Sequence, residues 1–203
     1  MARVRAGLPG WLKPALFVLC LVPLVRLLLL AAATDGLGAK PVEFVTRSTG
    51  TWALVMLCLT LAVTPLRRLL GWPALVRLRR MLGLFAFFHA SLHALVFLWL
   101  EHGFDLAALL LDVFERPAVT AGFLAFVMML PLAATSTQGM IRRLGRHWQA
   151  LHRLVYPVAV LAALHFWWHK ADDNDHDFTE PAIYACAVAL LLGLRLLRRR
   201  AGR

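Results

Sequence analysis

Six apolar stretches, each about twenty residues long, divide this chain and constrain its fold more than any other feature. They lie at approximately residues 14–32, 48–65, 81–100, 117–135, 150–169 and 181–197. The composition agrees, since 61% of the residues are hydrophobic and a soluble domain is only about half apolar. In hydrocarbon the backbone must satisfy its own hydrogen bonds, so each stretch is expected to be a helix. The sequence therefore predicts an all-α membrane protein, a six-transmembrane-helix bundle forming a single domain over residues 1–203.

The charged residues alternate in sign from one connecting segment to the next. All eleven acids lie in three segments, which are Asp35 and Glu43; Glu101, Asp105, Asp112 and Glu115; and Asp172, Asp173, Asp175, Asp177 and Glu180. Basic residues fill the other segments, at positions 3, 5 and 13; 67, 68, 77, 79 and 80; 142, 143, 146 and 153; and 195, 198, 199, 200 and 203. The positive-inside rule then predicts that both termini are cytoplasmic. The same rule accounts for the net charge of +11, so nucleic-acid binding is not needed to explain that charge. Membrane lipid is the expected contact of the basic residues.

The N-terminal segment and the spacing of the cysteines narrow the class of protein further. Arg3 and Arg5 precede an apolar stretch, as in a secretory signal, but that stretch is long and Arg26 interrupts it, so we expect a retained first helix. Cys20, Cys58 and Cys186 lie in different stretches without a CxxC or CxxCH motif. This spacing argues against a disulfide framework, a thiolate zinc site and covalently attached c-type haem.

Histidines occur inside two of the apolar stretches, in "FFHASLHALVF" and "ALHFWWHK". A helical rise of about 1.5 Å per residue places His93 and His165 within roughly 3 Å of the same membrane depth, in the outer half. Helix bundles build cofactor sites from facing helices, and haem iron accepts axial imidazole. We predict that His93 and His165 are axial ligands of haem iron. The alternative is a neutral histidine that is hydrogen-bonded to a backbone carbonyl.

His152 and His89 are weaker candidates. His152 lies 13 residues before His165, about 20 Å away along an unkinked helix. At its depth the third stretch offers Arg79 and Arg80 instead of histidine, so His152 is a candidate for an inner redox site of any kind, with haem, flavin or quinone. His89 precedes His93 by one turn and is an alternative ligand.

Arg26 sits at mid-to-outer depth in the first stretch, where an unpaired arginine is unfavourable. We predict a haem propionate as its counter-ion, with snorkelling toward the outer interface as the alternative.

A competing metal hypothesis joins His89, His93, His165 and His169 in a four-imidazole site. His102, His147 and His176 are expected to be solvated loop residues. No catalytic residue is predicted, because the sequence has no P-loop, GxSxG, HExxH or dinucleotide motif.

Three segments carry a family resemblance: "RRMLGLFAFFHASLHALVFLWLE", "RPAVTAGFLAFVMMLPLAATST" and "HWQALHRLVYPVAVLAALHFWW". They resemble the MsrQ family, formerly called YedZ, within the ferric-reductase-like transmembrane group that includes NADPH oxidases. The resemblance covers nearly the whole chain. It implies a bacterial inner-membrane protein with b-type haem bound by His93 and His165, with His152 as a further haem-associated position and with FMN as a second cofactor.

The resemblance also implies partners. Electrons would come from a cytosolic flavin reductase or the quinone pool and pass outward to MsrP, a soluble molybdopterin subunit that reduces methionine sulfoxide in periplasmic proteins. Compared with the ferric reductases, the inner histidine of the third stretch is missing. We expect an electron-transfer subunit with no substrate site of its own, in which the haem performs the redox chemistry.

Two other functions remain open from the sequence. A stand-alone ferric or cupric reductase of the same haem class would work without a periplasmic protein partner. A transporter or channel would need polar groups along a path, and the stretches offer few apart from the histidines and Arg26. No inverted repeat supports a transporter either.

Overall fold

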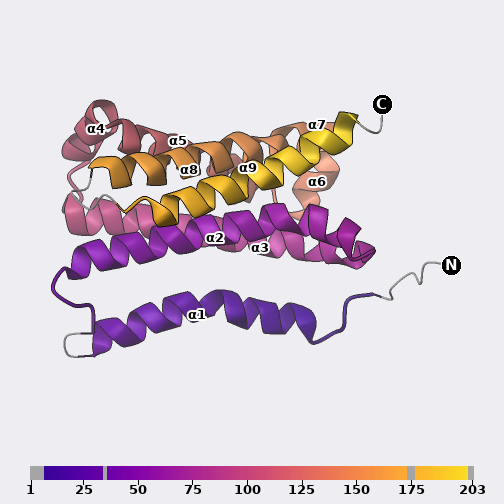
Figure 1. Cartoon of the computed structure of the whole chain (residues 1–203), viewed down its shortest axis with the longest axis horizontal. Helices are drawn as coiled ribbons and strands as arrows, with labels where there is room; N and C mark the ends of the chain where they lie inside the picture. The colour runs from indigo at the N-terminus through magenta and orange to yellow at the C-terminus, as the bar shows by residue number, and fades with distance from the viewer. Residues whose placement is uncertain (1–6, 34–35, 173–176, 201–203) are drawn as a thin grey trace. The chain divides into compact units, whose positions relative to one another are not determined.

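The structure is a computed structural model that describes residues 7–33, 36–172 and 177–200. The chain divides into two compact units, residues 1–101 and residues 102–203, and each is described by itself. The described residues form helices and no strand (Figure 1).

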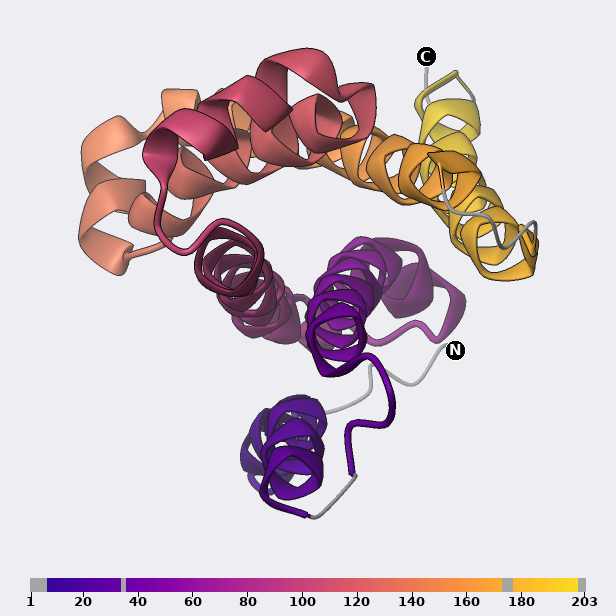
Figure 2. The same cartoon turned by 90° about the vertical axis from the view of Figure 1, so that its left-hand side faces the viewer.

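The first unit contains three long helices, α1 (Leu12–Ala32), α2 (Pro41–Leu69) and α3 (Val76–Val96). A 3₁₀ turn, η1 (Pro73–Leu75), precedes α3, and a π-helical turn, η2 (Phe97–Glu101), continues it. Helices α2 and α3 run antiparallel and side by side (Figures 1 and 2). Gly71, with φ +58°, allows the tight reversal between them because it has no Cβ.

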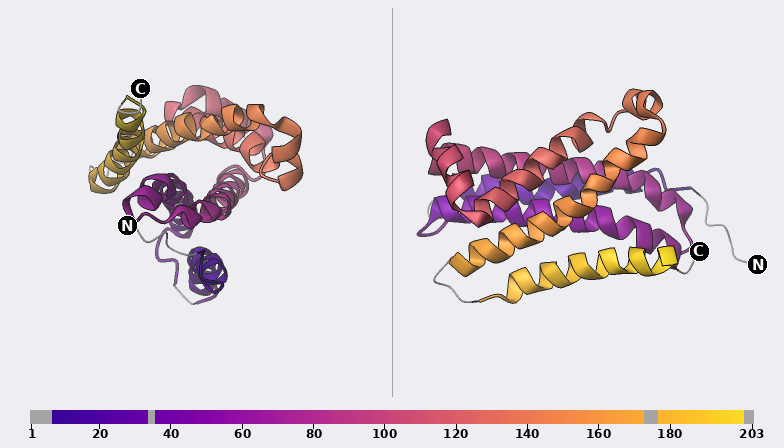
Figure 3. Two further views of the ribbon diagram at one scale, coloured as in Figure 1. Left: turned by 90° about the vertical axis from the view of Figure 1, so that its right-hand side faces the viewer. Right: turned by 90° about the horizontal axis from the view of Figure 1, so that it is seen from above.

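The described residues of the second unit form six helices and one 3₁₀ turn: α4 (Leu106–Glu115), α5 (Pro117–Ala134), α6 (Gln138–Leu144), α7 (Arg146–Leu151), η3 (His152–Leu154), α8 (Val155–Asp172) and α9 (Thr179–Arg200). Helix α8 lies between α5 and α9 (Figure 3). This position makes α8 the central helix of the unit.

The all-α fold with six membrane-spanning helices is confirmed. Six helical segments in the described part of the chain are long and apolar enough to cross a bilayer. Their apolar side chains are widely exposed, and only 17% of the apolar window of α1 is buried. Such a surface is stable when lipid, instead of water, surrounds it.

Three details differ from the sequence prediction. Helices α4 and α6 occupy segments that were expected to be plain connections. Helix α2 begins well before residue 48. The fifth stretch is not one helix, because η3 separates α7 from α8. Pro157 lies in the first turn of α8, and because it has no N–H it makes no helical hydrogen bond to the carbonyl of Arg153 in η3.

Asp105 begins α4 as its N-cap. Its Oδ1 accepts hydrogen bonds from the backbone N–H groups of Ala107, at 2.9 Å, and Ala108, at 3.1 Å. Removing an N-cap costs about 1 kcal/mol of helix stability. Asp105→Ala should therefore speed amide hydrogen exchange in residues 106–115 about five-fold, as measured by mass spectrometry. Asp105→Asn is the matched control, because asparagine caps equally well. Equal exchange in the two variants would contradict the capping role.

Candidate functional site

His93 on α3 is hydrogen-bonded to the backbone of the neighbouring helix α2. Its Nδ1 lies 3.0 Å from the carbonyl oxygen of Thr46 and 3.5 Å from the hydroxyl oxygen of Thr49. A carbonyl oxygen only accepts hydrogen bonds, so Nδ1 carries the ring proton and donates. The lone pair of the neutral imidazole is then on Nε2.

The ring of His93 lies directly against Gly50 of α2. A Cβ atom at Gly50 would stand 3.0 Å from Cε1 and 3.1 Å from Nδ1 of His93. Those distances are shorter than ordinary van der Waals contact between heavy atoms. A glycine at this position therefore allows the ring to approach the helix backbone.

His165 on α8 repeats this arrangement in the second unit. Its Nδ1 lies 2.7 Å from the carbonyl oxygen of Ala118 on α5. A Cβ atom at Gly122 would stand 2.8 Å from Nδ1 and 2.9 Å from Cε1. In both units the carbonyl residue precedes the histidine by 47 residues, and the glycine follows the carbonyl residue by one helical turn.

These contacts bear on the two interpretations of the histidines. A structural histidine is expected to donate a hydrogen bond to a backbone carbonyl, and both rings do so. In both rings the donor is Nδ1, which leaves Nε2 as the nitrogen with the lone pair. Histidines that bind metals usually donate their other ring N–H in this way, which fixes the tautomer and raises the basicity of the ligand nitrogen. Both rings therefore fit the role of an axial ligand through Nε2.

Both histidines also lie near the acidic end of their own unit. His93 contacts the second turn of α2, which begins at Pro41 and carries Glu43 in its first turn. His165 contacts the first turn of α5, which follows α4, the helix that carries Asp112 and Glu115. Each histidine therefore lies at the end of its unit that carries acidic residues, and its depth in the membrane stays a prediction.

His89 has a different environment, within the first unit. It is only 2% exposed, and its Nε2 lies 3.2 Å from the carbonyl oxygen of Cys20 on α1. Pro23, one turn later, interrupts the hydrogen-bond ladder of α1 beside that carbonyl. His89 therefore donates through Nε2, the nitrogen that the other two rings keep as a base, and it joins α3 to α1.

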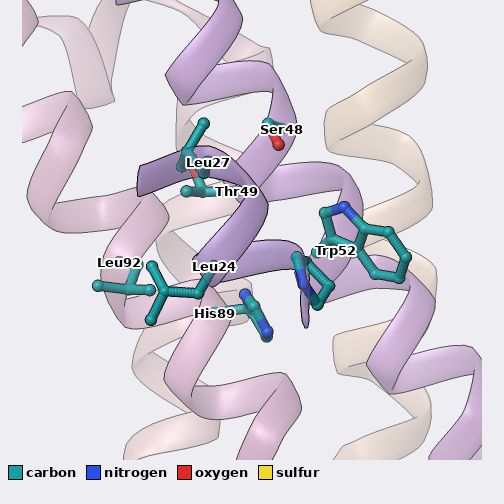
Figure 4. A pocket seen from close by; sticks show the side chains of 8 residues that line it. Leu24, Leu27, Ser48, Thr49, Trp52, His89 and Leu92 are labelled. Atoms are coloured by element: carbon teal, nitrogen blue, oxygen red, sulfur yellow. The ribbon is translucent and has the colours of Figure 1, made fainter. Parts of the chain in front are cut away.

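A small pocket borders His89 in the first unit (Figure 4). Its wall comes from α1, α2 and α3, with the residues Pro23, Leu24, Leu27, Ser48, Thr49, Trp52, His89 and Leu92. Most of these side chains are apolar. The pocket adds no further metal-binding side chain to His89.

His152 belongs to an aromatic cluster at the other end of the second unit. Its ring stacks on Trp148 at 3.9 Å between centroids, and its Nδ1 lies 3.2 Å from the Trp148 carbonyl oxygen. The indole N–H of Trp148 donates to the Thr135 carbonyl at 2.9 Å. The guanidinium of Arg195 stands 5.2 Å from the ring centroid of Tyr156. Planar rings and a cation thus surround this end of α8.

Of the remaining predicted residues, His169 lies beside His165, with 6.2 Å between the ring centroids. Arg26 is exposed on α1. Within each unit, the described residues contain no group of three or more His, Cys, Asp or Glu side chains that could hold a metal ion. The four-imidazole site, which would join residues of both units, stays a prediction. The expectation that His102 is solvated is wrong, because its side chain is 9% exposed and its Nε2 lies 3.2 Å from Asp112 Oδ2. His176 and most of the acidic segment 172–177 lie outside the described residues.

Four residues of this site were missed from the sequence: Thr46, Gly50, Ala118 and Gly122. Two of them contribute only backbone carbonyls, which have no sequence signature. The glycines did carry a signal, since each interrupts an apolar helix and a helical glycine is less stable than alanine by about 1 kcal/mol. Their equal spacing to the two histidines was the available clue.

Comparison with known proteins places the chain in a family. Residues 49–163 match the family described as "Ferric reductase like transmembrane component". The "Protein-methionine-sulfoxide reductase heme-binding subunit MsrQ" of Bordetella pertussis is 58% identical over 195 residues, covering 96% of this chain and 93% of that protein. The chain belongs to the MsrQ family. This confirms the family resemblance drawn from the sequence.

Other MsrQ proteins agree. Those of Ralstonia nicotianae and Xanthomonas campestris pv. campestris are 57% and 49% identical, covering 93% and 84% of this chain and 90% and 76% of those proteins. No solved structure matches the chain. Membership of the MsrQ family, together with six candidate spans, identifies a multi-pass protein of the bacterial inner membrane.

The bond between His89 and Cys20 predicts a structural role for His89. His89→Ala should lower the free energy of unfolding by about 2 kcal/mol, because it removes the hydrogen bond between α3 and α1 and leaves a cavity at a buried position. His89→Gln should recover part of this loss, since its amide N–H can donate. Thermal unfolding in detergent, followed by circular dichroism, measures both. His147→Ala is the control, because His147 is exposed on α7, and equal unfolding of His89→Ala and His147→Ala would contradict the prediction.

Proposed function

We propose that this MsrQ protein is the haem-binding electron-transfer subunit of a methionine sulfoxide reductase system, with His93 and His165 as axial ligands of b-type haem iron. The observation that carries the proposal is the pair of Nδ1–carbonyl bonds, at 3.0 Å and 2.7 Å. They assign both rings the tautomer that an iron ligand requires. The printed name of the Bordetella relative, a heme-binding subunit, supports the same cofactor.

The haem supplies one-electron chemistry when it is bound, and the chain supplies the binding and its electrostatics. His93 and His165 would hold the haem iron through Nε2. The carbonyl groups of Thr46 and Ala118 hold the Nδ1 protons and so orient each ring. The apolar helices exclude water from the site, and their side chains suit the apolar edge of a porphyrin.

The charge pattern supports the orientation of the chain in the membrane, and the family resemblance implies the direction of electron flow. Basic residues gather at one set of helix ends and acidic residues at the other, which supports cytoplasmic termini. Electrons then enter from a cytosolic flavin reductase or the quinone pool and leave toward a periplasmic MsrP-like molybdopterin reductase. FMN is the second cofactor of this proposal. His152 is the candidate for the inner redox site, and its stacking on Trp148 supports a site for a planar group.

A stand-alone ferric or cupric reductase is the second candidate, favoured by the description of the matched family. The two functions differ in their need for a protein partner. If the reduced protein is reoxidised by an MsrP-like subunit with methionine sulfoxide, but not by ferric or cupric chelates, the first function holds. Rapid reoxidation by the chelates alone would favour the second.

The ligand assignment predicts the spectra of two variants. His93→Ala and His165→Ala should each lose at least about ten-fold in haem affinity, because each removes an axial nitrogen. Oxidised and dithionite-reduced absorption spectra of the purified protein measure haem per polypeptide. His89→Ala and His147→Ala should keep the b-type spectrum of the unmodified chain. A normal spectrum in His93→Ala or in His165→Ala would contradict the assignment.

The proposed pairing of Arg26 with a haem propionate predicts a change in reduction potential. Arg26→Gln removes a positive charge and should lower the midpoint potential of the haem, since the oxidised iron carries the larger positive charge. Arg26→Lys keeps the charge and should leave the potential close to that of the unmodified protein. Redox titration followed by absorbance measures both. Equal potentials for Arg26→Gln and the unmodified protein would support snorkelling instead.

A further inference from the structure

We propose that Gly50 and Gly122 are positioning residues, each of which uncovers a helix carbonyl so that a histidine can bond to it. The geometry of the glycines stands on its own. Its link to iron binding rests on the proposed function. Together with Thr46 and Ala118, these glycines form two carbonyl–glycine latches, one on α2 and one on α5.

The physical reason lies in the geometry of the α-helix. The carbonyl of residue i accepts its helical bond from the N–H of residue i+4. The Cα–Cβ bond of residue i+4 tilts toward the helix N-terminus and so covers that carbonyl from the side. A glycine at i+4 leaves the second lone pair of the oxygen accessible. Thr46 with Gly50, and Ala118 with Gly122, have this relation.

The distances support the assignment at both positions. The carbonyl of each pair lies within hydrogen-bond distance of a histidine Nδ1. The missing Cβ would fall 3.1 Å from that nitrogen at Gly50 and 2.8 Å at Gly122. A methyl group at either position would occupy the space that the donating ring uses, and the conflict would be larger at Gly122.

Other glycines within the spans lack this relation. At Gly83 of α3 a Cβ would meet only the Thr60 side chain, with Cγ2 at 3.6 Å and Oγ1 at 4.0 Å. At Gly193 of α9 it would meet nothing within 4 Å. Alanine is the better helix former by about 1 kcal/mol, so an apolar span gains stability from alanine unless the missing Cβ has a use. At Gly50 and Gly122 that use is access of the imidazole.

The latch has an electronic consequence as well as a steric one. A donated Nδ1–H bond raises the basicity of Nε2. A more basic axial ligand stabilises ferric iron and lowers the reduction potential, and hydrogen bonding around the ligands is one of the means by which proteins set that potential. Loss of a latch should therefore raise the midpoint potential and tilt the imidazole plane.

The test compares four alanine variants: Gly122→Ala, Gly50→Ala, Gly83→Ala and Gly193→Ala. The readouts are haem affinity, midpoint potential and the electron paramagnetic resonance spectrum of the ferric form. We expect Gly122→Ala to lose about ten-fold or more in affinity, with a raised potential and a changed spectrum. Gly50→Ala should show a smaller change in the same direction. The two control variants should match the unmodified protein.

The outcomes separate the latch from general damage and from failure of the haem proposal. Haem properties of Gly50→Ala and Gly122→Ala that match those of the controls would overturn the latch. If Gly122→Ala does not accumulate, the milder Gly50→Ala decides. If the unmodified protein binds no haem, the proposed function fails while the latch remains testable. In that case ¹⁵N chemical shifts of the histidine rings should report protonated Nδ1, lost in Gly122→Ala, and a protonated Nε2 in the unmodified chain would overturn the latch.

Discussion

The structure depends on how imidazole groups are satisfied inside an apolar medium. A ring N–H in hydrocarbon needs an acceptor, and helix carbonyls are the acceptors at hand. His93 and His165 each donate Nδ1–H to a carbonyl of the adjacent helix, whereas His89 donates Nε2–H. The choice of nitrogen separates two kinds of histidine. The rings of His93 and His165 keep the lone pair on Nε2 and are suited to bind iron. The ring of His89 donates through Nε2 and joins α3 to α1.

The same constraint explains the placement of glycine and proline in the spans. Gly50 and Gly122 remove a side chain that would block access to a carbonyl. Pro23 disturbs the hydrogen-bond ladder of α1 beside the carbonyl that His89 uses, and Pro157 lies in the first turn of α8, directly after the turn that carries His152. In each case a residue that weakens a helix in isolation lies next to a histidine contact. The cost in helix stability is local, and the benefit is a defined ring orientation.

The sequence predicted those parts of the structure that follow from hydropathy and from unusual residues. Six spans and the MsrQ family could be recognised, because long apolar runs and intramembrane histidines are rare and distinctive. Helix α4 was missed, since it is a short helix within a connection. The burial of His102 was missed too, because its pairing with Asp112 depends on how α4 folds back. The carbonyl partners of the histidines depend on the register between neighbouring helices, which no single span encodes.

The most direct test is a cryo-electron microscopy map of the haem-loaded protein, bound to an antibody fragment, at a resolution that shows imidazole orientation. The account predicts iron bonded to Nε2 of both His93 and His165. It also predicts that Nδ1 of each ring lies about 2.7–3.2 Å from the carbonyl oxygen of Thr46 or Ala118. Iron bound to His89, or to either ring through Nδ1, would contradict it.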